Sequence, residues 1–406
     1  MKEPKIRFKG FSEEWEETTL ANVGKCFSGI GFPETEQGKK KGIPFYKVSD
    51  MNNIGNEKVM SNSNNYVTEE QVNKNGWKVC NDVPAIYFAK VGAAVLLNRK
   101  RLVLKPCLCD NNTMLYSLDK KVWDTYFCQS YFETIDLASL VQVGSLPSYN
   151  ASMVGEVNVS LPDIGEQKAL GAYFQHLDNL IQSTTKKIKS LKQVKAASLQ
   201  SMFPQEGETT PRVRFKGFEG EWEKVAVSTL LEERREFEIM SDEYPLKAFI
   251  AYVGVSEKGE RYDRSSLVND VENKVYKKTD LGDFIYSSNN LETGSIGLNK
   301  YGKATISPVY SIFKCTEKSY SGYIGCAFTC KDFINKMVKW RQGVMYGQWR
   351  IHESDFLKID IFVPSFDEQR CIGNYFTNLD RQITLQTQRL EKLKQIKAAC
   401  LDNMFV

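Results

Sequence analysis

A short segment containing glycine and lysine has the spacing of a phosphate-binding loop. It reads Gly297-Leu-Asn-Lys-Tyr-Gly302-Lys303 in this chain of 406 residues. A nucleotide-binding loop needs Ser or Thr at the next position, to hold magnesium, and then a helix whose N-terminus faces the phosphate. Ala304 follows instead, and the run TISPVYSIF is typical of a β-strand. The sequence therefore argues against a nucleotide site here.

A second segment carries the residue types of a metal-dependent nuclease, in which carboxylates hold magnesium and a lysine assists. These residues are Asp163, Glu166 and Lys168. The segment occurs again near the end of the chain, as Ser365, Glu368 and Arg370. Serine can replace Asp163 as a helix N-cap but not as a metal ligand. We therefore interpret Asp163 and Ser365 as N-caps, each with a glutamate at the spacing of a capping box.

Other catalytic and metal-binding patterns are weak. Ten cysteines occur without a CxxC pair and with only two histidines, so a zinc site has little support; Cys107 with Cys109 and Cys326 with Cys330 remain the candidates. We expect reduced, mostly buried thiols. We find no adenine-methyltransferase loop, no glycine-rich cofactor loop after a strand and no GxSxG elbow. We expect no catalysis by this chain alone, no metal and no cofactor bound to it.

Basic and polar clusters are more suggestive of DNA binding. Lys39-Lys40-Lys41 lies beside glycines, and Asn98-Arg99-Lys100-Arg101 interrupts two apolar runs. Trp340-Arg341-Gln342 and Gln348-Trp349-Arg350 place Arg and Gln beside aromatic residues. Arg, Lys, Asn and Gln can contact purine edges in the major groove, and Lys also neutralises phosphates. Each cluster taken alone is also what a solvated loop looks like.

Composition fits a folded protein of two or three domains. Hydrophobic residues make up 42% and charged residues 26%, and the net charge is +4. This mild charge permits nucleic-acid binding without demonstrating it. No apolar run approaches the length of a membrane span, and the charged N-terminus does not resemble a secretory signal, so we expect a cytoplasmic protein.

The most informative feature of the chain is an internal repeat. Pro4–Glu16 returns as Pro211–Glu223 with nine identities in thirteen positions, and Pro162–Phe203 returns as Pro364–Phe405 with 19 in 42. The blocks between these matches, Ala21–Asn150 and Ser228–His352, show no alignment. The chain is thus a duplicated module with a constant frame and a variable block.

The repeated C-terminal part of each module predicts a helix of about 38–40 residues, or roughly 57–60 Å. Apolar residues follow the 3,4 spacing of a helix seam, with Thr184 and Gln386 as equivalent polar interruptions. The seam residues are Leu170, Phe174, Leu177, Ile181, Ile188 and Leu191, then Ile372, Phe376, Leu379, Ile383, Leu390 and Leu393. We expect the two helices to form an antiparallel coiled coil within one chain. A homodimer through the same seams is the alternative.

The variable blocks predict mixed α and β structure, so the fold class is α+β. Runs rich in β-branched and aromatic residues are bounded by turn residues: GIPFYKVSDM, DVPAIYFAKVGAAVLL, ATISPVYSIFKC and KIDIFVP. ESDFLKI and KDFINKMVKW are typical of short helices. The expected organisation is a first domain at 1–160, a helix at 161–203, a linker at 204–212, a second domain at 213–362 and a helix at 363–406.

The whole chain resembles the specificity subunit of type I restriction–modification systems. The resemblance is carried by RFKGFSEEWE and RFKGFEGEWE, by LPDIGEQKALGAYFQHLD and VPSFDEQRCIGNYFTNLD, and by the tails LKQVKAASLQSMF and LKQIKAACLDNMF. Within the blocks, FAKVGAAVLLNRKR, CLCDNNTMLYSL, GSIGLNKYGKATISPVY and GQWRIHESDFLKI look like recurrent recognition segments of that family.

The resemblance implies a DNA reader without catalytic activity. Each variable block would be a target recognition domain that reads one half of a split, asymmetric site in double-stranded DNA. The helices would set the spacer and dock two modification subunits, which use S-adenosylmethionine; restriction subunits would add ATP- and magnesium-dependent translocation and cleavage. The matching positions predict DNA contacts at Lys39, Lys40, Lys47, Lys90, Arg99, Lys100, Arg101, Asn299, Lys300, Lys303, Arg341, Gln348 and Arg350.

Two readings from other classes stay open. A stand-alone nuclease or methyltransferase is disfavoured by the absent cofactor loop and by the exchange of Asp163 for Ser365. A coiled-coil scaffold that binds only proteins would explain the helices. It would not explain why two unlike blocks rich in Arg and Lys are carried on matched helices.

Overall fold

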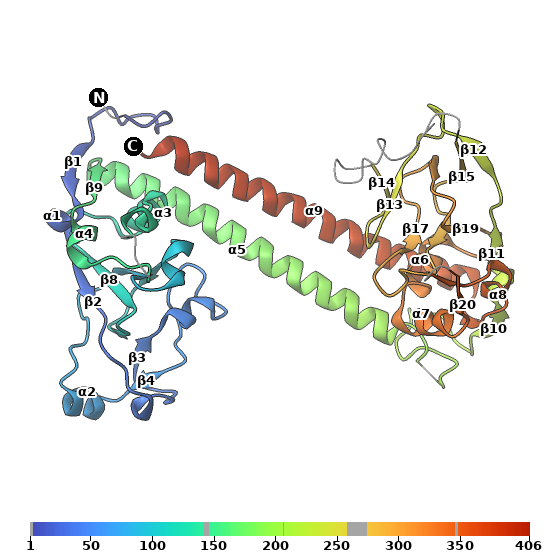
Figure 1. Cartoon of the computed structure of the whole chain (residues 1–406), viewed down its shortest axis with the longest axis horizontal. Coiled ribbons are helices and arrows are strands. Elements are labelled where there is room, and N and C mark those ends of the chain that lie inside the picture. The colour runs from blue at the N-terminus through green and yellow to red at the C-terminus, as the bar shows by residue number, and fades with distance from the viewer. Residues whose placement is uncertain (1–2, 142–145, 206, 258–273, 346–347) are drawn as a thin grey trace. The chain divides into compact units, whose positions relative to one another are not determined.

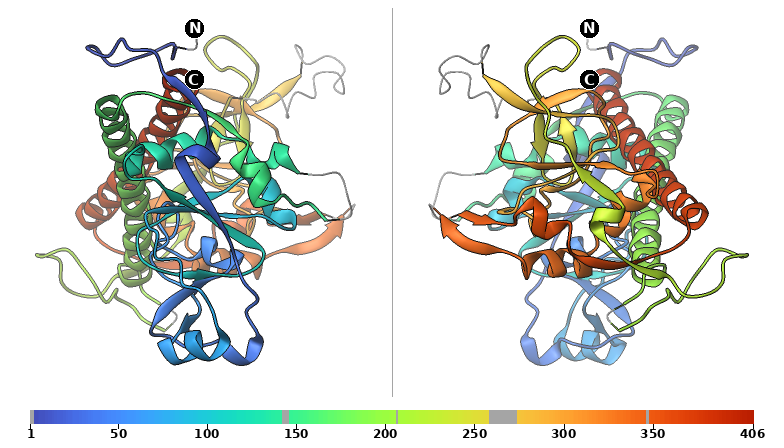
Figure 2. Two further views of the ribbon diagram at one scale, coloured as in Figure 1. Left: turned by 90° about the vertical axis from the view of Figure 1, so that its left-hand side faces the viewer. Right: turned by 90° about the vertical axis from the view of Figure 1, so that its right-hand side faces the viewer.

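The computed structural model describes residues 3–141, 146–205, 207–257, 274–345 and 348–406. The chain divides into two compact units. The first comprises Met1–Thr185 together with Gln388–Val406, and the second comprises Lys186–Thr387. The two views of Figure 2 bring each unit in turn toward the viewer.

The first unit opens with a two-stranded frame. β1 (Glu16–Thr19) pairs antiparallel with β9 (Asn158–Leu161), which leads directly into the long helix α5 (Ile164–Ser201) (Figure 1). The short helices α1 (Leu20–Val23) and α4 (Ala151–Gly155) lie next to this frame. The strand pair therefore joins the two ends of the recognition block to the start of the helix.

The core of the first unit is a four-stranded antiparallel sheet in the order β2-β8-β5-β6. Its strands are β2 (Gly24–Ser28), β8 (Thr113–Leu118), β5 (Ala85–Ala89) and β6 (Lys100–Val103). Ile86 and Phe88 of β5 join the main core, whereas Tyr87 joins a second cluster with Leu115. Because side chains alternate along a strand, both faces of this sheet are covered.

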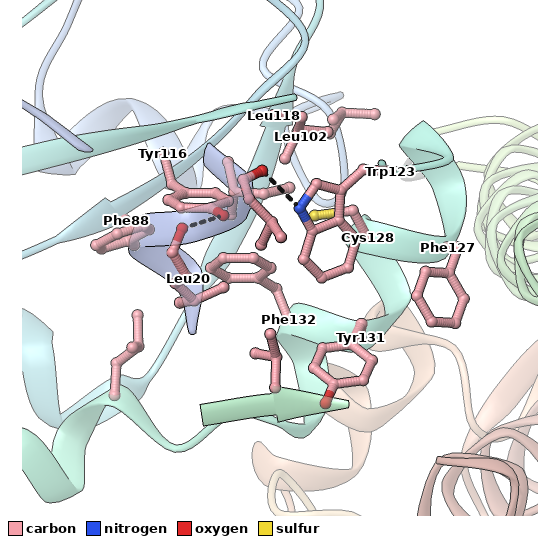
Figure 3. Close-up of a cluster of buried hydrophobic side chains, with 14 of the residues drawn as sticks. Leu20, Phe88, Leu102, Tyr116, Leu118, Trp123, Phe127, Cys128, Tyr131 and Phe132 are labelled. Carbon is pink, nitrogen blue, oxygen red and sulfur yellow. Dashed lines mark hydrogen bonds between the residues drawn. The ribbon is translucent and has the colours of Figure 1, made fainter. Parts of the chain in front are cut away.

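The main core of the first unit is rich in aromatic residues. Phe132 of helix α3 (Thr125–Thr134) packs against Tyr116, with ring centroids 5.1 Å apart (Figure 3). The Tyr116 hydroxyl donates to the carbonyl of Leu20 at 2.8 Å, and the Trp123 indole N–H donates to the carbonyl of Val23 at 2.9 Å. These bonds satisfy polar atoms that burial would otherwise penalise.

A smaller three-stranded sheet in the order β4-β3-β7 completes the first block. Its strands are β3 (Ile43–Tyr46), β4 (Tyr66–Val67) and β7 (Leu108–Cys109). The remaining elements are α2 (Glu69–Asn75) and the 3₁₀ helices η1 (Glu34–Glu36), η2 (Val48–Asn52), η3 (Ala93–Leu97) and η4 (Leu137–Leu140). The run DVPAIYFAKVGAAVLL, which is rich in β-branched and aromatic residues, forms a strand only at Ala85–Ala89. Gly92, at φ +84°, ends the extended backbone, so its last five residues form η3.

The second unit repeats this plan with different residues. β10 (Glu223–Ala226) pairs antiparallel with β22 (Asp360–Val363), and the central sheet has the order β11-β19-β16-β17. Its strands are β11 (Leu231–Glu233), β19 (Ser311–Cys315), β16 (Phe284–Tyr286) and β17 (Ile296–Leu298). Two blocks without alignable sequence thus share one sheet order.

Smaller elements surround the second sheet. They are β12 (Phe237–Ile239), β15 (Val275–Thr279) and β18 (Ala304–Ile306) in one sheet, the pairs β13 (Ala248–Ile250) with β14 (Gly254–Ser256) and β20 (Gln342–Met345) with β21 (Gln348–Arg350), η5 (Val227–Thr229), and α6 (Ser321–Ala327), α7 (Lys331–Val338) and α8 (Glu353–Phe356). The predicted short helices in KDFINKMVKW and ESDFLKI are confirmed as α7 and α8. The strand that follows Lys303, which argued against a nucleotide loop, is confirmed as β18.

The two long helices begin at the predicted caps. The Asp163 carboxylate accepts from the backbone N–H of Gly165 at 2.7 Å and of Glu166 at 3.2 Å, and the Ser365 hydroxyl accepts from that of Glu368 at 3.4 Å. The N-cap interpretation is therefore confirmed. The reciprocal half of the capping box was wrong, because Glu166 and Glu368 accept from arginines instead.

The prediction that the long helices pack antiparallel within one chain is confirmed inside each unit. In the first, Tyr173 of α5 lies 3.4 Å from the Cys400 thiol of α9 (Phe366–Met404). In the second, Ser198 near the end of α5 lies 2.9 Å from the Tyr375 hydroxyl near the start of α9. Early residues of one helix thus meet late residues of the other in both units. A homodimer is not needed to cover these seams.

The seam residues lie where the helical spacing places them. The buried members are Leu170, Phe174, Leu177, Ile372, Phe376 and Leu379, and the half-buried ones are Ile181, Ile188, Leu191, Ile383, Leu390 and Leu393. Of the two polar interruptions, Thr184 is buried and Gln386 is half-buried. Burial is therefore deepest where the helices touch the recognition blocks.

Candidate nucleic-acid interface

An ion pair joins the opening motif of each module to its long helix. The Arg7 guanidinium donates to both carboxylate oxygens of Glu166, at 2.8 and 2.7 Å. Arg214 donates in the same way to Glu368, at 2.8 and 2.6 Å. Both carboxylates are about 1% exposed. The bidentate, charge-assisted hydrogen bonds from arginine compensate the cost of removing these carboxylates from water. The repeated motifs RFKGF and EQ therefore join the opening segment of each module to its long helix. We call these repeated parts of each module the frame.

A buried amide and a close backbone approach fix the recognition block on the helix. The Gln167 carbonyl accepts from the backbone N–H of Asp124 at 3.0 Å, and its amide donates to the carbonyls of Val122 and Pro162. Gln369 makes the equivalent contacts in the second unit. A Cβ at Gly171 would lie 2.6 Å from the backbone nitrogen of Phe127, so only glycine allows this approach. The frame thus positions the variable surfaces and leaves them free to differ.

Two arginines of the first block keep donors unused. Arg99 donates to the Asn52 side chain at 2.7 Å, and Arg101 donates to the carbonyl of Lys100 at 2.8 Å. Within the described part of the chain, neither Nε–H has a hydrogen-bond partner, but both of these nitrogens are buried, so contact with a base is left to the terminal guanidinium nitrogens. Leu96 and Leu97, just before them, are exposed. Guanidinium donors beside exposed apolar side chains can contact guanine edges and thymine methyl groups.

Lys100, also predicted to contact DNA, holds the protein together instead. Its ammonium donates to the carbonyl of Ile135 at 2.5 Å and to the side chain of Asn98 at 2.7 Å. Burial lowers the pKa of Lys100 to about 8, although Asp136 and Glu133 oppose this shift. Its place in the run NRKR did not reveal this role, because the carbonyl that it contacts belongs to Ile135, which is distant in sequence.

The remaining lysines predicted in the first block differ in their surroundings. Lys39 and Lys40 are exposed, and Lys90 is half-buried. Lys47 is half-buried and donates to the Gln37 side chain at 3.3 Å. Lys39 and Lys40 therefore have the clearest access to phosphates.

A cluster of asparagine side chains lies beside Arg99 and was not predicted from the sequence. Asn53 donates to Asn62 at 3.0 Å and to Asn64 at 3.2 Å, and the buried carboxylate of Asp50 accepts from Asn53 and from the backbone of Asn64. Asparagine side chains can form paired hydrogen bonds with adenine. The signal was in the composition, since asparagine recurs throughout MNNIGNEKVMSNSNN.

Asn299 of the second block does not suit DNA contact, and this prediction was wrong. Its side chain is fully buried and donates to Thr279 at 3.1 Å and to the carbonyl of Gly302 at 2.7 Å. Its oxygen accepts from the backbone of Tyr301 and Gly302. The amide shapes the turn between β17 and β18, and a buried polar group with its bonds made is not available to a base.

The two lysines of that turn point to different partners. Lys300 is exposed, and its ammonium lies 3.5 Å from the Asp380 carboxylate of α9. Lys303 pairs with Glu243 and stands over the Tyr244 ring. Both ion pairs join largely or partly exposed side chains, whose pairing energy is low, so neither prevents a contact with phosphate.

The hairpin of β20 and β21 carries the remaining predicted contacts. Arg341 just before it donates from Nε to the carbonyl of Ser288 at 3.1 Å and from Nη1 to Glu292 at 3.0 Å, whereas its Nη2 is buried and has no hydrogen-bond partner among the described residues. Arg350 is exposed, and its guanidinium is weakly paired with the Glu353 carboxylate, at 3.8 Å. The neighbouring Trp349 is exposed as well. Gln348 begins β21, but its side chain lies outside the described residues. Arg350 with Trp349 is thus the best placed pair of the second block.

Among the described residues, no group of three or more His, Cys, Asp or Glu is arranged to hold a metal ion. The ten cysteines are free and buried or half-buried. In the same parts of the chain, no helix is long and apolar enough to cross a membrane.

Two blocks of one sheet order on matched frames define a duplicated two-module protein. The chain matches the family described as type I restriction modification DNA specificity domain twice, over residues 12–193 and 219–395. The chain therefore belongs to this family and carries two tandem specificity domains.

A solved structure agrees with this fold. The type I restriction–modification S subunit from M. genitalium is similar over 100% of this chain and 99% of its own, with a TM-score of 0.65 and 13% identity. The HsdS subunit from Thermoanaerobacter tengcongensis is similar over 97% of both chains, with a TM-score of 0.46 and 13% identity.

Proposed function

We propose that this chain is the sequence-reading subunit of a type I restriction–modification complex. Each recognition domain reads one half of an asymmetric, bipartite site in double-stranded DNA. The first domain corresponds to residues 1–160 and the second to residues 213–362, with the linker at 204–212 and the helical parts at 161–203 and 363–406. The observation that carries this proposal is the pairing of equivalent frames with unlike blocks.

The two blocks favour an asymmetric site. The buried amides of Gln167 and Gln369 hold the two blocks in the same way on their helices. The side chains at the surface of the blocks differ, with half-buried Arg99 and Arg101 and the exposed Asn64 in one and the exposed pair Trp349 and Arg350 in the other. Because base contacts specify sequence and frame contacts do not, two unlike surfaces read two unlike half-sites.

The long helices set the distance between the half-sites in this proposal. Half-sites on one face of B-DNA have centres roughly 34–36 Å apart, or a multiple of this distance. A helix of 38 residues is about 57 Å long, which is enough to enforce such a separation. The frame surfaces also dock two modification subunits.

The chemistry of the complex resides in its partners. Modification subunits bind S-adenosylmethionine and methylate adenine, and restriction subunits use ATP and magnesium to translocate and cleave DNA. This chain contributes recognition without catalysis or cofactor, in the cytoplasm. Membership of a DNA specificity family leaves the scaffold alternative without support.

Methylation mapping tests the proposal. The chain is co-expressed with a matching modification subunit, and the host DNA is sequenced for N6-methyladenine. We expect a split, asymmetric motif that appears only when this chain is present. An intact complex that writes no new motif would contradict the proposal and restore the scaffold alternative.

A further inference from the structure

The same three-charge contact occurs in both units, between a recognition block and the two long helices. In the first unit, Asp178 of α5 lies 2.7 Å from the ammonium of Lys397 on α9 and 3.4 Å from that of Lys58 in the block. In the second, Asp380 of α9 pairs with Lys195 of α5 and lies 3.5 Å from Lys300 in the block. Each aspartate thus receives one lysine from the other helix and one from the block.

The helix members of these contacts belong to the internal repeat, but the block members do not. Asp178 aligns with Asp380, and Lys195 aligns with Lys397. Lys58 lies between η2 and β4, whereas the second block supplies its lysine from the turn between β17 and β18. Two segments without common sequence or position therefore bring an ammonium group to the same carboxylate. The shared feature is therefore the position of the ammonium group opposite the aspartate, and not a sequence motif common to the two blocks.

Both lysines are presented by ordered backbone. The carbonyl of Lys58 accepts from the backbone N–H of Leu102 at 2.9 Å and from the Gln129 amide at 3.0 Å. Lys300 follows Asn299, whose buried side chain bonds the turn on both sides. A contact between either ammonium group and the helices therefore constrains the position of the whole block.

We propose that Asp178 and Asp380 are positioning residues that fix the orientation of each recognition block on the helix pair. The inference rests on the proposed function, because orientation matters through the separation of the half-sites. Without the contact to its aspartate, a block can change its orientation on the helices. The complex then also methylates sites whose spacer is slightly shorter or longer than the natural one. The base sequence of the half-site that the block recognises does not change.

The two contacts differ in strength. In the first unit Glu133 of α3 joins the cluster and accepts from both Lys58 and Lys397, and Lys397 is only 7% exposed. In the second unit Lys300 is 64% exposed and has no such second acid among its described ion pairs. Water and salt screen the second contact more, so it is the contact to test without loss of folding.

Lys300→Met and Asp380→Asn separate positioning from DNA contact. Each variant is assembled with its modification subunits, and methylation is measured on synthetic DNA whose spacer is the natural length or one base pair shorter or longer. Positioning predicts the same phenotype for both variants. Methylation at the altered spacers, relative to the natural spacer, rises by roughly two- to fivefold, the effect of a weak surface ion pair. The salt dependence of binding stays unchanged.

A phosphate contact by Lys300 predicts a different pattern. Lys300→Met would then lower affinity and the salt slope, whereas Asp380→Asn would free the ammonium and leave binding unchanged or stronger. Lys314→Met is the matched control, since Lys314 pairs with Glu232 of the same block and should change neither the spacer preference nor the salt slope. Unchanged spacer preference in both variants overturns the positioning role. A wild-type complex that writes no bipartite motif contradicts the proposed function instead.

Discussion

Phe203 and Phe405 hold equivalent places in the two units. Phe405 lies against Phe174 with ring centroids 5.2 Å apart and also packs on Trp15 of the first unit. Phe203 lies 6.0 Å from Phe376 and packs on Trp222 of the second. Phe203, just after α5, thus completes the core of the second unit, and Phe405, just after α9, completes that of the first.

Replacing either phenylalanine should therefore weaken a unit as a core substitution does. We expect Phe405→Ala to lower the free energy of unfolding of the first unit by about 3–5 kcal/mol, with Phe203→Ala acting alike on the second. Denaturant unfolding with hydrogen exchange assigns the loss to a unit. Val406→Ala is the control, because that side chain is half-exposed. Equal losses in both units from one substitution would show that the units do not fold as described.

The frame ion pairs should be more costly to break than pairs at the surface. Glu166→Gln removes the charge that faces Arg7 but keeps the shape, and we expect a loss of about 2–3 kcal/mol in the free energy of unfolding. The control is Asp367→Asn, whose partner Arg370 is exposed. Thermal unfolding of both variants measures the difference. A loss no larger than that of the control would mean that water already screens the Arg7 contact.

The repeated segments predicted most of the frame. Helical spacing located the seams from Leu170 and Ile372 onward, and the exchange of Asp163 for Ser365 identified the caps, because both signals depend on residues near in sequence. The recognition surfaces were harder to predict. Asn299 and Lys100 look like surface groups in sequence, but distant residues bury them. The shared sheet order of the two blocks left no alignable sequence, because many combinations of apolar residues fill a core of the same shape.

Lys100 should make stability depend on pH in the alkaline range. Its pKa is about 8 in the folded protein and returns to its ordinary value of 10.5 on unfolding. Between these values the unfolded state binds more protons, so stability rises as the pH rises from about 8 to 10.5. We expect Lys100→Met to remove that rise, measured by denaturant unfolding at several pH values. The salt slope of DNA binding should not change, and a fall would restore Lys100 as a phosphate contact.

Arginines and lysines of the recognition surfaces should have different effects on binding. We expect Arg350→Ala to cost about 1–3 kcal/mol and to relax one base position, because its guanidinium is exposed and weakly paired. Lys40→Ala should weaken binding to all sequences and lower the salt slope by about one. Binding of the assembled complex to substituted sites, at several salt concentrations, distinguishes the two. Uniform losses for Arg350→Ala would make it a phosphate contact.

Lengthening both helices together should lengthen the spacer. Seven residues inserted after Thr185 and seven after Thr387, where the chain divides into its two units, add about 10 Å, or roughly three base pairs of B-DNA. Seven residues keep each seam in phase to within about 20°, so the helices can pack as before. Methylation mapping should then show both half-sites unchanged around a longer spacer. A four-residue insertion adds about 6 Å but turns the seam by about 40°, so it should lower stability as well. If the seven-residue variant methylates at the original spacer, the helices do not determine the distance between the half-sites.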